Sequence, residues 1–162
     1  MEKLAQAVGQ LLKKNRQVLV TAESCTGGWA AQVVTSVAGS SDWFERGFVT
    51  YSNDSKRELL GVAEATLEKR GAVSEETARE MALGALARSK ASLALAITGV
   101  AAPAGGSKEK PVGTVCLAWA LGETVHSETR RFDGDRESVR RQSVVRALEG
   151  VIELLEEKGM EG

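Results

Sequence analysis

Three short apolar segments, each preceded by a helix-like segment, constrain the fold of this chain more than any other feature. The segments span residues 17–21, 47–51 and 93–97, and β-branched or small apolar residues dominate them. Short apolar strands that alternate with helices are typical of α/β proteins. The expected helices are 3–14, 29–37, 55–60 and 74–86.

The last third of the chain follows a different pattern. Residues 112–120 and 124–132 predict an antiparallel pair that turns at 121–123, and a final helix begins near Asp135. The loop 99–111 contains both prolines and is long, which favours a functional role. We predict an α/β fold in which a three-layer α/β/α sandwich surrounds a mixed, mostly parallel sheet, in one domain of residues 1–162.

Charge and hydropathy exclude several classes of protein. The chain has 21 Lys and Arg against 22 Asp and Glu, so it offers no broad basic surface, and nucleic acid is not expected as a partner. Neither a signal peptide nor a membrane span is apparent, so we expect a cytoplasmic protein without membrane contact. Cys25 and Cys116 are far apart and have no nearby ligand partners, so neither a metal site nor a disulfide is predicted.

Hydroxyl residues lie at or just beyond the ends of the three early strands. In open α/β sheets ligands bind beyond the carboxyl ends of parallel strands, so these residues should converge. Ser24 precedes Gly27 and Gly28 at the start of a helix, where free N–H groups can stabilise an oxyanion. The alternative is that Glu23, Ser24 and Thr26 only cap that helix. Cys25 is a rival nucleophile, although its apolar neighbours favour a packed thiol.

Lys56 is the candidate base for Ser24. A serine hydroxyl needs a proton acceptor, and the only histidine, His126, is interpreted as a strand residue. Burial would lower the pKa of Lys56 and leave part of it neutral, whereas the alternative is a solvated lysine. Tyr51 would orient Lys56 or donate to a substrate, unless its ring is simply buried.

Arginines begin the last helix. Arg136 and Arg140 share a helix face, Arg141 follows, and clustered guanidinium groups suit a phosphate, although they could also form a charged outer face. The phosphate-binding loops of P-loop and dinucleotide-binding proteins are absent, and so is the nucleophile elbow of α/β-hydrolases.

Four motifs taken together resemble the CinA C-terminal family. They are AESCTGG at 22–28, GFVTYSN at 47–53, GAVS at 71–74 and KPVGTV at 110–115, and the similarity runs from about residue 4 to residue 155. Stand-alone members of that family are nicotinamide-nucleotide amidohydrolases. The resemblance therefore implies hydrolysis of nicotinamide mononucleotide to nicotinate mononucleotide and ammonia, without a cofactor, by a protein that self-associates into a homo-oligomer.

The resemblance also implies site residues. The family's serine and lysine fall on Ser24 and Lys56, and Tyr51 and Thr98 match further positions of its catalytic site. The expected substrate-binding residues are Thr26, Gly27, Gly28, Gly99, Arg136, Arg140 and Arg141.

One loop departs from the family pattern. Residues 99–106 read GVAAPAGG, so that Ala102 replaces a glycine and Ala104 replaces an acidic residue. A methyl group at a position that needs a positive φ would strain the loop. The alternative function is therefore a catalytically silent nucleotide-binding or assembly domain with the same fold.

Overall fold

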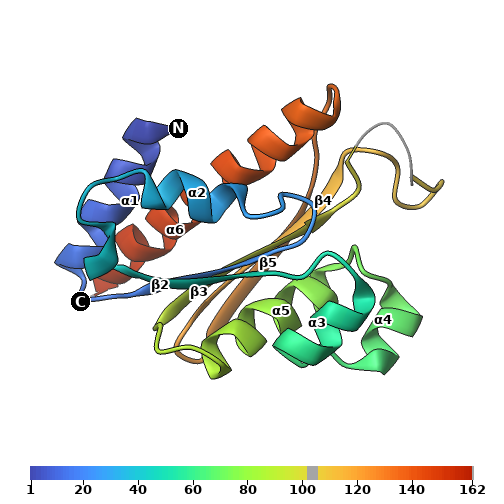
Figure 1. The fold of residues 1–162 in the computed structure, drawn as a ribbon, viewed down its shortest axis with the longest axis horizontal. Helices are drawn as coiled ribbons and strands as arrows, with labels where there is room; N and C mark the ends of the chain where they lie inside the picture. Colours follow the sequence, from blue (N-terminus) through green and yellow to red (C-terminus); the bar gives the residue numbers. More distant parts are fainter. Residues whose placement is uncertain (102–105, 162) are drawn as a thin grey trace.

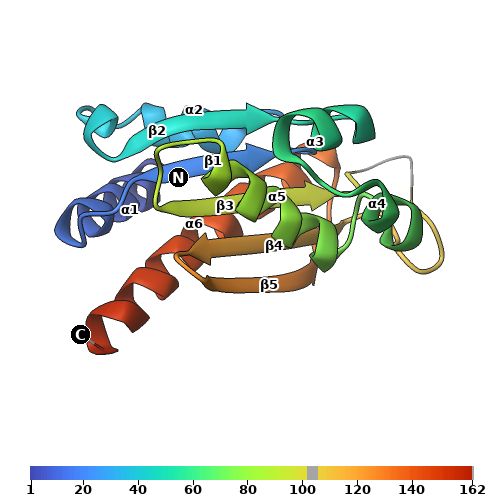
Figure 2. The ribbon, with the colours of Figure 1, turned by 90° about the horizontal axis from the view of Figure 1, so that it is seen from below.

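A mixed sheet forms the centre of the computed structural model, which describes residues 1–101 and 106–161, with side chains up to residue 157. The strand order is β2-β1-β3-β4-β5. The bounds are β1 Leu19–Glu23, β2 Phe44–Val49, β3 Leu93–Gly99, β4 Thr114–Leu121 and β5 Thr124–Arg131. β1 pairs in parallel with β2 and β3, whereas β4 is antiparallel to both β3 and β5. All the strands of this sheet except β4 therefore run in one direction (Figure 2).

Helices cover both faces of the sheet. Their bounds are α1 Glu2–Lys14, α2 Trp29–Thr35, α3 Asn53–Leu60, α4 Glu64–Arg70, α5 Glu75–Ala87 and α6 Arg136–Glu161. α1, α2 and α6 lie on one face, and α3, α4 and α5 lie on the other (Figure 1). Each layer encloses its own apolar core against the sheet. The predicted three-layer α/β/α sandwich around a mixed sheet is confirmed.

Several elements differ from the expectation; β1, for example, spans Leu19–Glu23 and not residues 17–21. Helix α4 was not predicted, because Leu67 is its only buried residue among those described and no apolar period marks it. Its first turn is stabilised instead by Glu80 of α5, which accepts hydrogen bonds from the N–H of Ala63 and the hydroxyl of Thr66. Strand β2 spans Phe44–Val49 and not residues 47–51. It begins earlier because its first residues pair with β1 even though they include charged and partly exposed side chains, and Thr50 and Tyr51 follow its end.

Two tryptophans fix the helices of the first face by packing on glycines. A Cβ at Gly9 of α1 would lie 2.6 Å from the ring of Trp43, and a Cβ at Gly150 of α6 would lie 2.1 Å from the ring of Trp119. The Trp119 indole N–H also donates to the carbonyl of Ala147 at 2.8 Å. Each glycine therefore permits a close approach that any larger residue would prevent.

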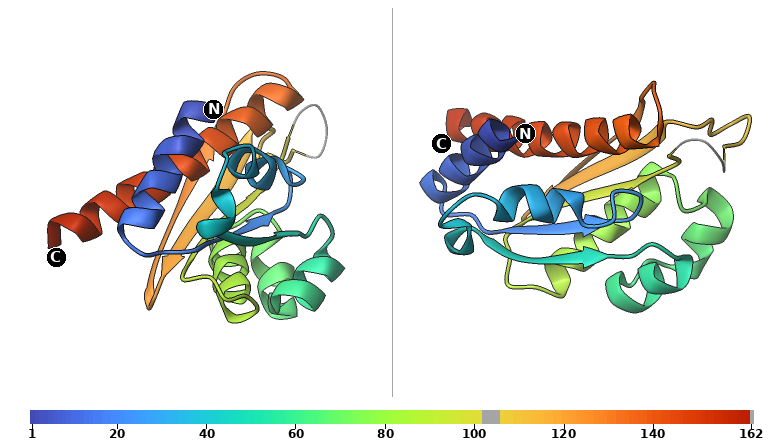
Figure 3. Two further views of the ribbon diagram at one scale, coloured as in Figure 1. Left: turned by 60° about the vertical axis from the view of Figure 1, so that its left-hand side comes forward. Right: turned by 45° about the horizontal axis from the view of Figure 1, so that its top comes forward.

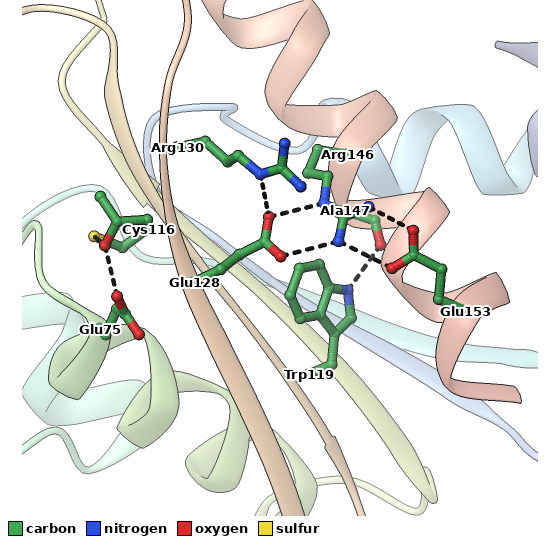
Figure 4. A network of polar contacts seen from close by, with 9 residues as sticks. Glu75, Cys116, Trp119, Glu128, Arg130, Arg146, Ala147 and Glu153 are labelled. Atoms are coloured by element: carbon green, nitrogen blue, oxygen red, sulfur yellow. Dashed lines mark hydrogen bonds and ion pairs between the residues drawn. The ribbon is translucent and has the colours of Figure 1, made fainter. Parts of the chain in front are cut away.

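An ionic network continues this attachment of α6 to the sheet. Arg146 lies over the Trp119 ring at 5.4 Å and donates to the carboxylates of Glu128 on β5 and Glu153 on α6, as Figure 4 shows. Held in this way, α6 runs along the sheet beside α1 (Figure 3). Its first residues lie close to the end of β3, because Arg131 pairs with Thr114 and Gly99 pairs with Val115.

Candidate functional site

The carboxyl ends of β1, β2 and β3 meet at one edge of the sheet, since the three strands are parallel neighbours. A pocket of about 270 Å³ opens at this edge. It is lined by Ser24, Cys25, Tyr51, Lys56, Ala72, Val73, Thr98, Gly99, Val100, Ala101 and Arg136. Hydroxyl groups at or just beyond the strand ends, the amine of Lys56 from α3 and the guanidinium group of Arg136 from α6 therefore meet at a single small cavity.

Ser24 and Lys56 are in direct contact in this pocket. The Nζ of Lys56 donates to the Oγ of Ser24 at 3.0 Å, and the lysine is only 1% exposed. Lys56 lies in the first turn of α3, which begins with a capping box in which Ser52 and Ser55 bind each other's backbone N–H groups. This cap fixes the start of the helix and thereby directs the Lys56 side chain toward the ends of the strands.

A closed chain of bonds holds the serine and the lysine together. Lys56 Nζ also donates to the carbonyl oxygen of Thr50 at 2.9 Å, and the N–H of Thr50 donates to the carbonyl oxygen of Glu23 at 2.8 Å. Glu23 is covalently joined to Ser24. The distance between Ser24 and Lys56 therefore depends on the pairing of β1 with β2 as well as on the side chains themselves.

Burial is the main electrostatic influence on Lys56. Removal from water disfavours the ammonium form and lowers the pKa of Lys56, and the neighbouring Cys25 opposes this only as a lesser contribution. No carboxylate forms an ion pair with Lys56 in the described part of the chain. A lysine in these surroundings holds its proton less tightly than a solvated lysine, which favours a role as proton acceptor.

Cys25 and His126, the two other candidates for nucleophile and base chemistry, differ in position. Cys25 borders the pocket, but burial raises the pKa of its thiol to about 11, so the reactive thiolate is scarce at neutral pH. His126 is exposed and lies in β5, where it pairs with Trp119 of β4. Strands β3 and β4 lie between β5 and β1, so His126 is separated from the end of β1. The interpretation of His126 as a strand residue is confirmed.

Around the turn after Ser24, the residues that cap helix α2 differ from the residue whose side chain enters the pocket. The buried carboxylate of Glu23 accepts hydrogen bonds from the hydroxyl of Thr26 and from the N–H groups of Ala30 and Ala31. Glu23 is thus the residue that caps α2, Thr26 supports it, and the hydroxyl of Ser24 is bonded to Lys56 instead. The alternative that Glu23, Ser24 and Thr26 only cap the helix is therefore right for Glu23 and Thr26 and wrong for Ser24.

Backbone N–H groups of this turn are only partly available. Gly27 and Gly28 have φ values of +60° and +103°, which favour glycine, and they turn the chain into α2. The N–H of Gly27 donates to the carbonyl of Ser24 at 3.1 Å, so it is already used within the turn. The N–H groups of Thr26 and Gly28 have no hydrogen-bond acceptor among the described residues.

Tyr51 stands at the mouth of the pocket and is 63% exposed, so the alternative of a buried ring is wrong. The hydroxyl oxygen of Tyr51 accepts a hydrogen bond from Arg136 Nη2 at 3.0 Å. In the described part of the chain, Tyr51 forms no hydrogen bond with Lys56. Arg136 borders both this pocket and a second depression of about 560 Å³, which is lined by residues 26–29 and not by Ser24 or Lys56. Tyr51 and Arg136 therefore form a pair at the entrance.

The three arginines predicted to bind a phosphate, Arg136, Arg140 and Arg141, take different positions, although Arg136 and Arg140 both border the second depression. Arg140 donates from Nε to the carbonyl of Cys25 at 3.0 Å and from Nη2 to the carbonyl of Thr26 at 3.2 Å. Arg141 pairs with Glu137 and lies over the ring of Trp29, and it lines neither depression. Only Arg136 reaches the pocket that contains Ser24 and Lys56.

Thr98 and Gly99 shape the floor of the pocket. The hydroxyl of Thr98 donates to the carbonyl of Ala72 at 2.8 Å and so holds the loop that carries Ala72 and Val73 against the strand ends. A Cβ at Gly99 would lie 2.8 Å from the side chain of Val115 and 3.2 Å from the sulfur of Cys25. Glycine is thus required at position 99 by close packing. Ala102 and Ala104, which depart from the family pattern, lie outside the described residues.

Sequence reasoning missed the carbonyl of Thr50 and the wall formed by Ala72, Val73, Val100 and Ala101. A main-chain acceptor leaves no signal in a sequence, because every residue has a carbonyl group. No group of metal-ligating side chains was found in the part of the chain that the structure describes. Within that same part, no helix combines the length and the apolar character needed to cross a membrane.

Comparisons with known proteins find relatives over most of the chain. The family model of the CinA C-terminal domain matches residues 1–155. Nicotinamide-nucleotide amidohydrolase PncC of Escherichia coli K12 is 55% identical over 150 residues, covering 90% of this chain and 89% of that protein. The protein of the same name from Pseudomonas putida is 54% identical over 151 residues, covering 93% and 94%.

Solved structures share the same fold. Competence/damage inducible protein CihA from Agrobacterium tumefaciens superposes with a TM-score of 0.91 at 48% identity, covering 94% of each chain. A CinA superfamily protein from Klebsiella pneumoniae 700603 superposes with a TM-score of 0.93 at 37% identity, covering 96% of this chain and 98% of that one.

Proposed function

The chain belongs to the CinA C-terminal domain family, and from that membership we propose that it hydrolyses the carboxamide of nicotinamide mononucleotide to nicotinate mononucleotide and ammonia. It is a nicotinamide-nucleotide amidohydrolase of pyridine nucleotide salvage, like the relatives that share more than half of its residues. The observation that carries the mechanism is the 3.0 Å contact between the buried Lys56 and Ser24.

Acylation would begin with a proton transfer. Neutral Lys56 accepts the proton of Ser24, and the Ser24 Oγ attacks the carboxamide carbon to form a tetrahedral intermediate. We assign the stabilisation of its negative charge to backbone N–H groups of the turn after Ser24. Those of Thr26 and Gly28 have no acceptor among the described residues, although both residues border the second depression and not the pocket of Ser24. Protonated Lys56 then donates to the amide nitrogen, the C–N bond breaks, and ammonia leaves an ester on Ser24.

Deacylation reverses these roles. A water molecule gives its proton to Lys56 and attacks the ester carbon, and the oxygen of Ser24 leaves as it regains a proton from the lysine. The sum is amide plus water giving carboxylic acid plus ammonia, so atoms and charge balance. Burial of Lys56, which lowers its pKa, lets one amine serve as acceptor and donor near neutral pH.

Substrate binding is assigned from the walls of the pocket. The apolar surface of Val73, Val100 and Ala101 suits the flat nicotinamide ring, whereas Arg136 at the entrance suits the phosphate. Tyr51 orients Arg136 through its hydroxyl. Thr98 and Gly99 keep the floor in place, and Gly27 and Arg140 act through the turn that bears Ser24. Arg141 does not line the pocket and contacts Glu137 and Trp29 instead, so we assign it no direct contact with the substrate.

We also propose that residues 1–162 act as one domain, that the protein self-associates into a homo-oligomer, and that it works in the cytoplasm. The continuous five-stranded sheet and a family match over residues 1–155 support the first statement. Light scattering of the purified protein tests self-association, and cell fractionation tests the location.

The decisive experiment measures ammonia release from nicotinamide mononucleotide by purified protein. We expect turnover by the wild type and its loss in Ser24→Ala and Lys56→Ala, with Cys25→Ala retaining activity. Full turnover by Ser24→Ala would eliminate the assignment of the nucleophile. Tight binding of the mononucleotide without ammonia release would favour the catalytically silent alternative, and calorimetry distinguishes the two.

A further inference from the structure

We propose that Glu23 and Arg140 are positioning residues for Ser24, which hold the turn of residues 24–28 from two sides and keep the serine hydroxyl in front of Lys56. This inference rests on the proposed function, because it takes Ser24 as the nucleophile. Glu23 does not line the pocket, and Arg140 lines only the second depression. Both are therefore argued to act through the turn and without contact to the reacting atoms.

Glu23 holds the inner side of the turn. Its carboxylate is fully buried and, among the described residues, forms no ion pair. It accepts from Thr26 Oγ1 at 2.6 Å, from the N–H of Ala30 at 2.9 Å and from the N–H of Ala31 at 3.1 Å. A buried carboxylate is tolerated only when its acceptor sites are filled, so these bonds fix its position closely. The residue before Ser24 is thereby tied to the first turn of α2.

The main chain of Glu23 extends this hold to the base. Its carbonyl oxygen accepts from the N–H of Thr50, whose own carbonyl accepts from Lys56. A shift of Glu23 would therefore move Ser24 directly and Lys56 through Thr50. One residue outside the pocket thus influences the placement of both members of the reacting pair.

Arg140 holds the outer side of the turn from α6. It donates to the carbonyls of Cys25 and Thr26, and its guanidinium group lies 5.5 Å from the ring centroid of Trp29, the first residue of α2. In a trans peptide the N–H points away from the carbonyl, so the bond to the Cys25 carbonyl also sets the direction of the Thr26 N–H. Arg140 therefore orients a group assigned to oxyanion stabilisation.

The expected signature is a loss of kcat without a loss of substrate affinity. Misplacement of a reacting group by about 1 Å costs up to about 100-fold in rate. We expect Glu23→Gln and Arg140→Lys to lower kcat about 10- to 100-fold while KM stays nearly constant, because an interaction realised only in the transition state is lost. Arg136→Lys should instead raise KM, since Arg136 faces the pocket.

The chain offers matched controls. Glu80 accepts from the N–H of Ala63 and the hydroxyl of Thr66, so it caps α4 as Glu23 caps α2. Arg146 lies over Trp119 at 5.4 Å, as Arg140 lies over Trp29 at 5.5 Å on the same helix. Glu80→Gln and Arg146→Lys therefore reproduce the loss of capping and of stacking away from the turn, and their kcat should remain that of the wild type.

A second readout measures Ser24 without the nucleotide. Phenylmethanesulfonyl fluoride reacts with activated serines: the Ser24 oxygen bonds to sulfur, the S–F bond breaks, fluoride leaves and Lys56 takes the proton. The rate of labelling, followed by intact mass with Ser24→Ala as the blank, should fall in Glu23→Gln and Arg140→Lys as kcat does. Circular dichroism shows whether each variant is folded. If Glu23→Gln does not fold, Arg140→Lys alone provides the test.

The outcomes separate the two proposals. Folded Glu23→Gln and Arg140→Lys proteins that label as fast as the wild type would overturn the positioning role, and so would a wild type that is not labelled at all. A wild type that is labelled at Ser24 but releases no ammonia from the nucleotide would overturn the proposed function alone. Slow labelling in both variants, with normal labelling in both controls, is the expected result.

Discussion

The side-chain nitrogen of Lys56 lies 2.9 Å from the carbonyl oxygen of Thr50 and 3.0 Å from the hydroxyl oxygen of Ser24. A neutral amine has two N–H donors and one lone pair. In that form one N–H still satisfies Thr50, and the lone pair can take the place of the N–H that Lys56 directs at Ser24 and accept the serine proton. An ammonium ion in the same position would lack a carboxylate partner among the described residues. The geometry thus suits a neutral amine that accepts a proton.

The pH dependence of kcat/KM should report this amine. Burial lowers the pKa of Lys56, so protonated enzyme is inactive at low pH and activity rises as pH increases through the lowered pKa. Initial rates of ammonia release across the acid to alkaline range test this. A rate without an acid limb would contradict the assignment of Lys56 as the base.

Lys56→Met should stabilise the protein while abolishing its activity. The pKa of Lys56 is lower in the folded protein than in the unfolded chain, so the folded state binds this proton less tightly. The stability linked to Lys56 is therefore present above the unfolded pKa and lost as pH falls through the folded pKa. At neutral pH methionine removes that penalty. We expect a higher Tm and a fall in kcat of about 10²- to 10⁴-fold.

Measuring the Tm of Lys56→Met and of the wild type at alkaline pH provides the control for this prediction. The difference in Tm between Lys56→Met and wild type should narrow as pH approaches the ordinary pKa of lysine, about 10.4. Equal destabilisation by Lys56→Met at all pH values would show that packing, and not the buried charge, dominates at this position.

Cys25→Ala should keep most of the activity. Burial raises the pKa of the Cys25 thiol to about 11, so it remains protonated and unreactive under assay conditions. Because the sulfur packs in the core, we expect a loss of about 1 kcal/mol in stability, measured by denaturant unfolding. Loss of turnover in Cys25→Ala with retention in Ser24→Ala would transfer the nucleophile role to the cysteine.

Gly99→Ala should damage both stability and activity. The added methyl group would lie 2.8 Å from Val115 Cγ2 and 3.0 Å from the carbonyl oxygen of Thr114, in the floor of the pocket. Overpacking of this kind costs about 1–3 kcal/mol. Gly39→Ala is the matched control: it has a φ of +84° but nothing within 4 Å of the added Cβ, so only backbone strain is expected and kcat should be unchanged.

Arg146→Ala should affect stability alone. Arg146 is 13% exposed and holds the carboxylates of Glu128 and Glu153 (Figure 4), so its removal should cost about 1–3 kcal/mol. Hydrogen bonds from Arg146 lower the pKa of both carboxyl groups. The stability that these two ion pairs contribute is therefore present above the ordinary glutamate pKa and is lost as pH falls through the lowered pKa values. The difference in unfolding free energy between variant and wild type should shrink in acid.

Local patterns accounted for the types of most elements, whereas the bounds of several strands and helices differ by two or three residues from those predicted. Buried strands such as β1 and β3 were evident because all or nearly all their residues are apolar or small, and the predicted helix 74–86 is present as α5, where the hydroxyl of Ser74 binds the N–H of Thr77. Helix α4 was missed because a single buried leucine produces no period. Information that lies in neighbouring residues can be read along the chain, whereas a tertiary cap from Glu80 cannot.

The sequence by itself determined that hydroxyl groups end three strands and that a lysine follows one of them. Only the tertiary structure decided which of these groups meet. Ser24 and Lys56 are 32 residues apart, and their contact depends on β1 lying between β2 and β3 and on the register that bonds Thr50 to Glu23. Register and strand order arise from long-range packing and from main-chain bonds that every residue type can make, so no local pattern of side chains specifies them.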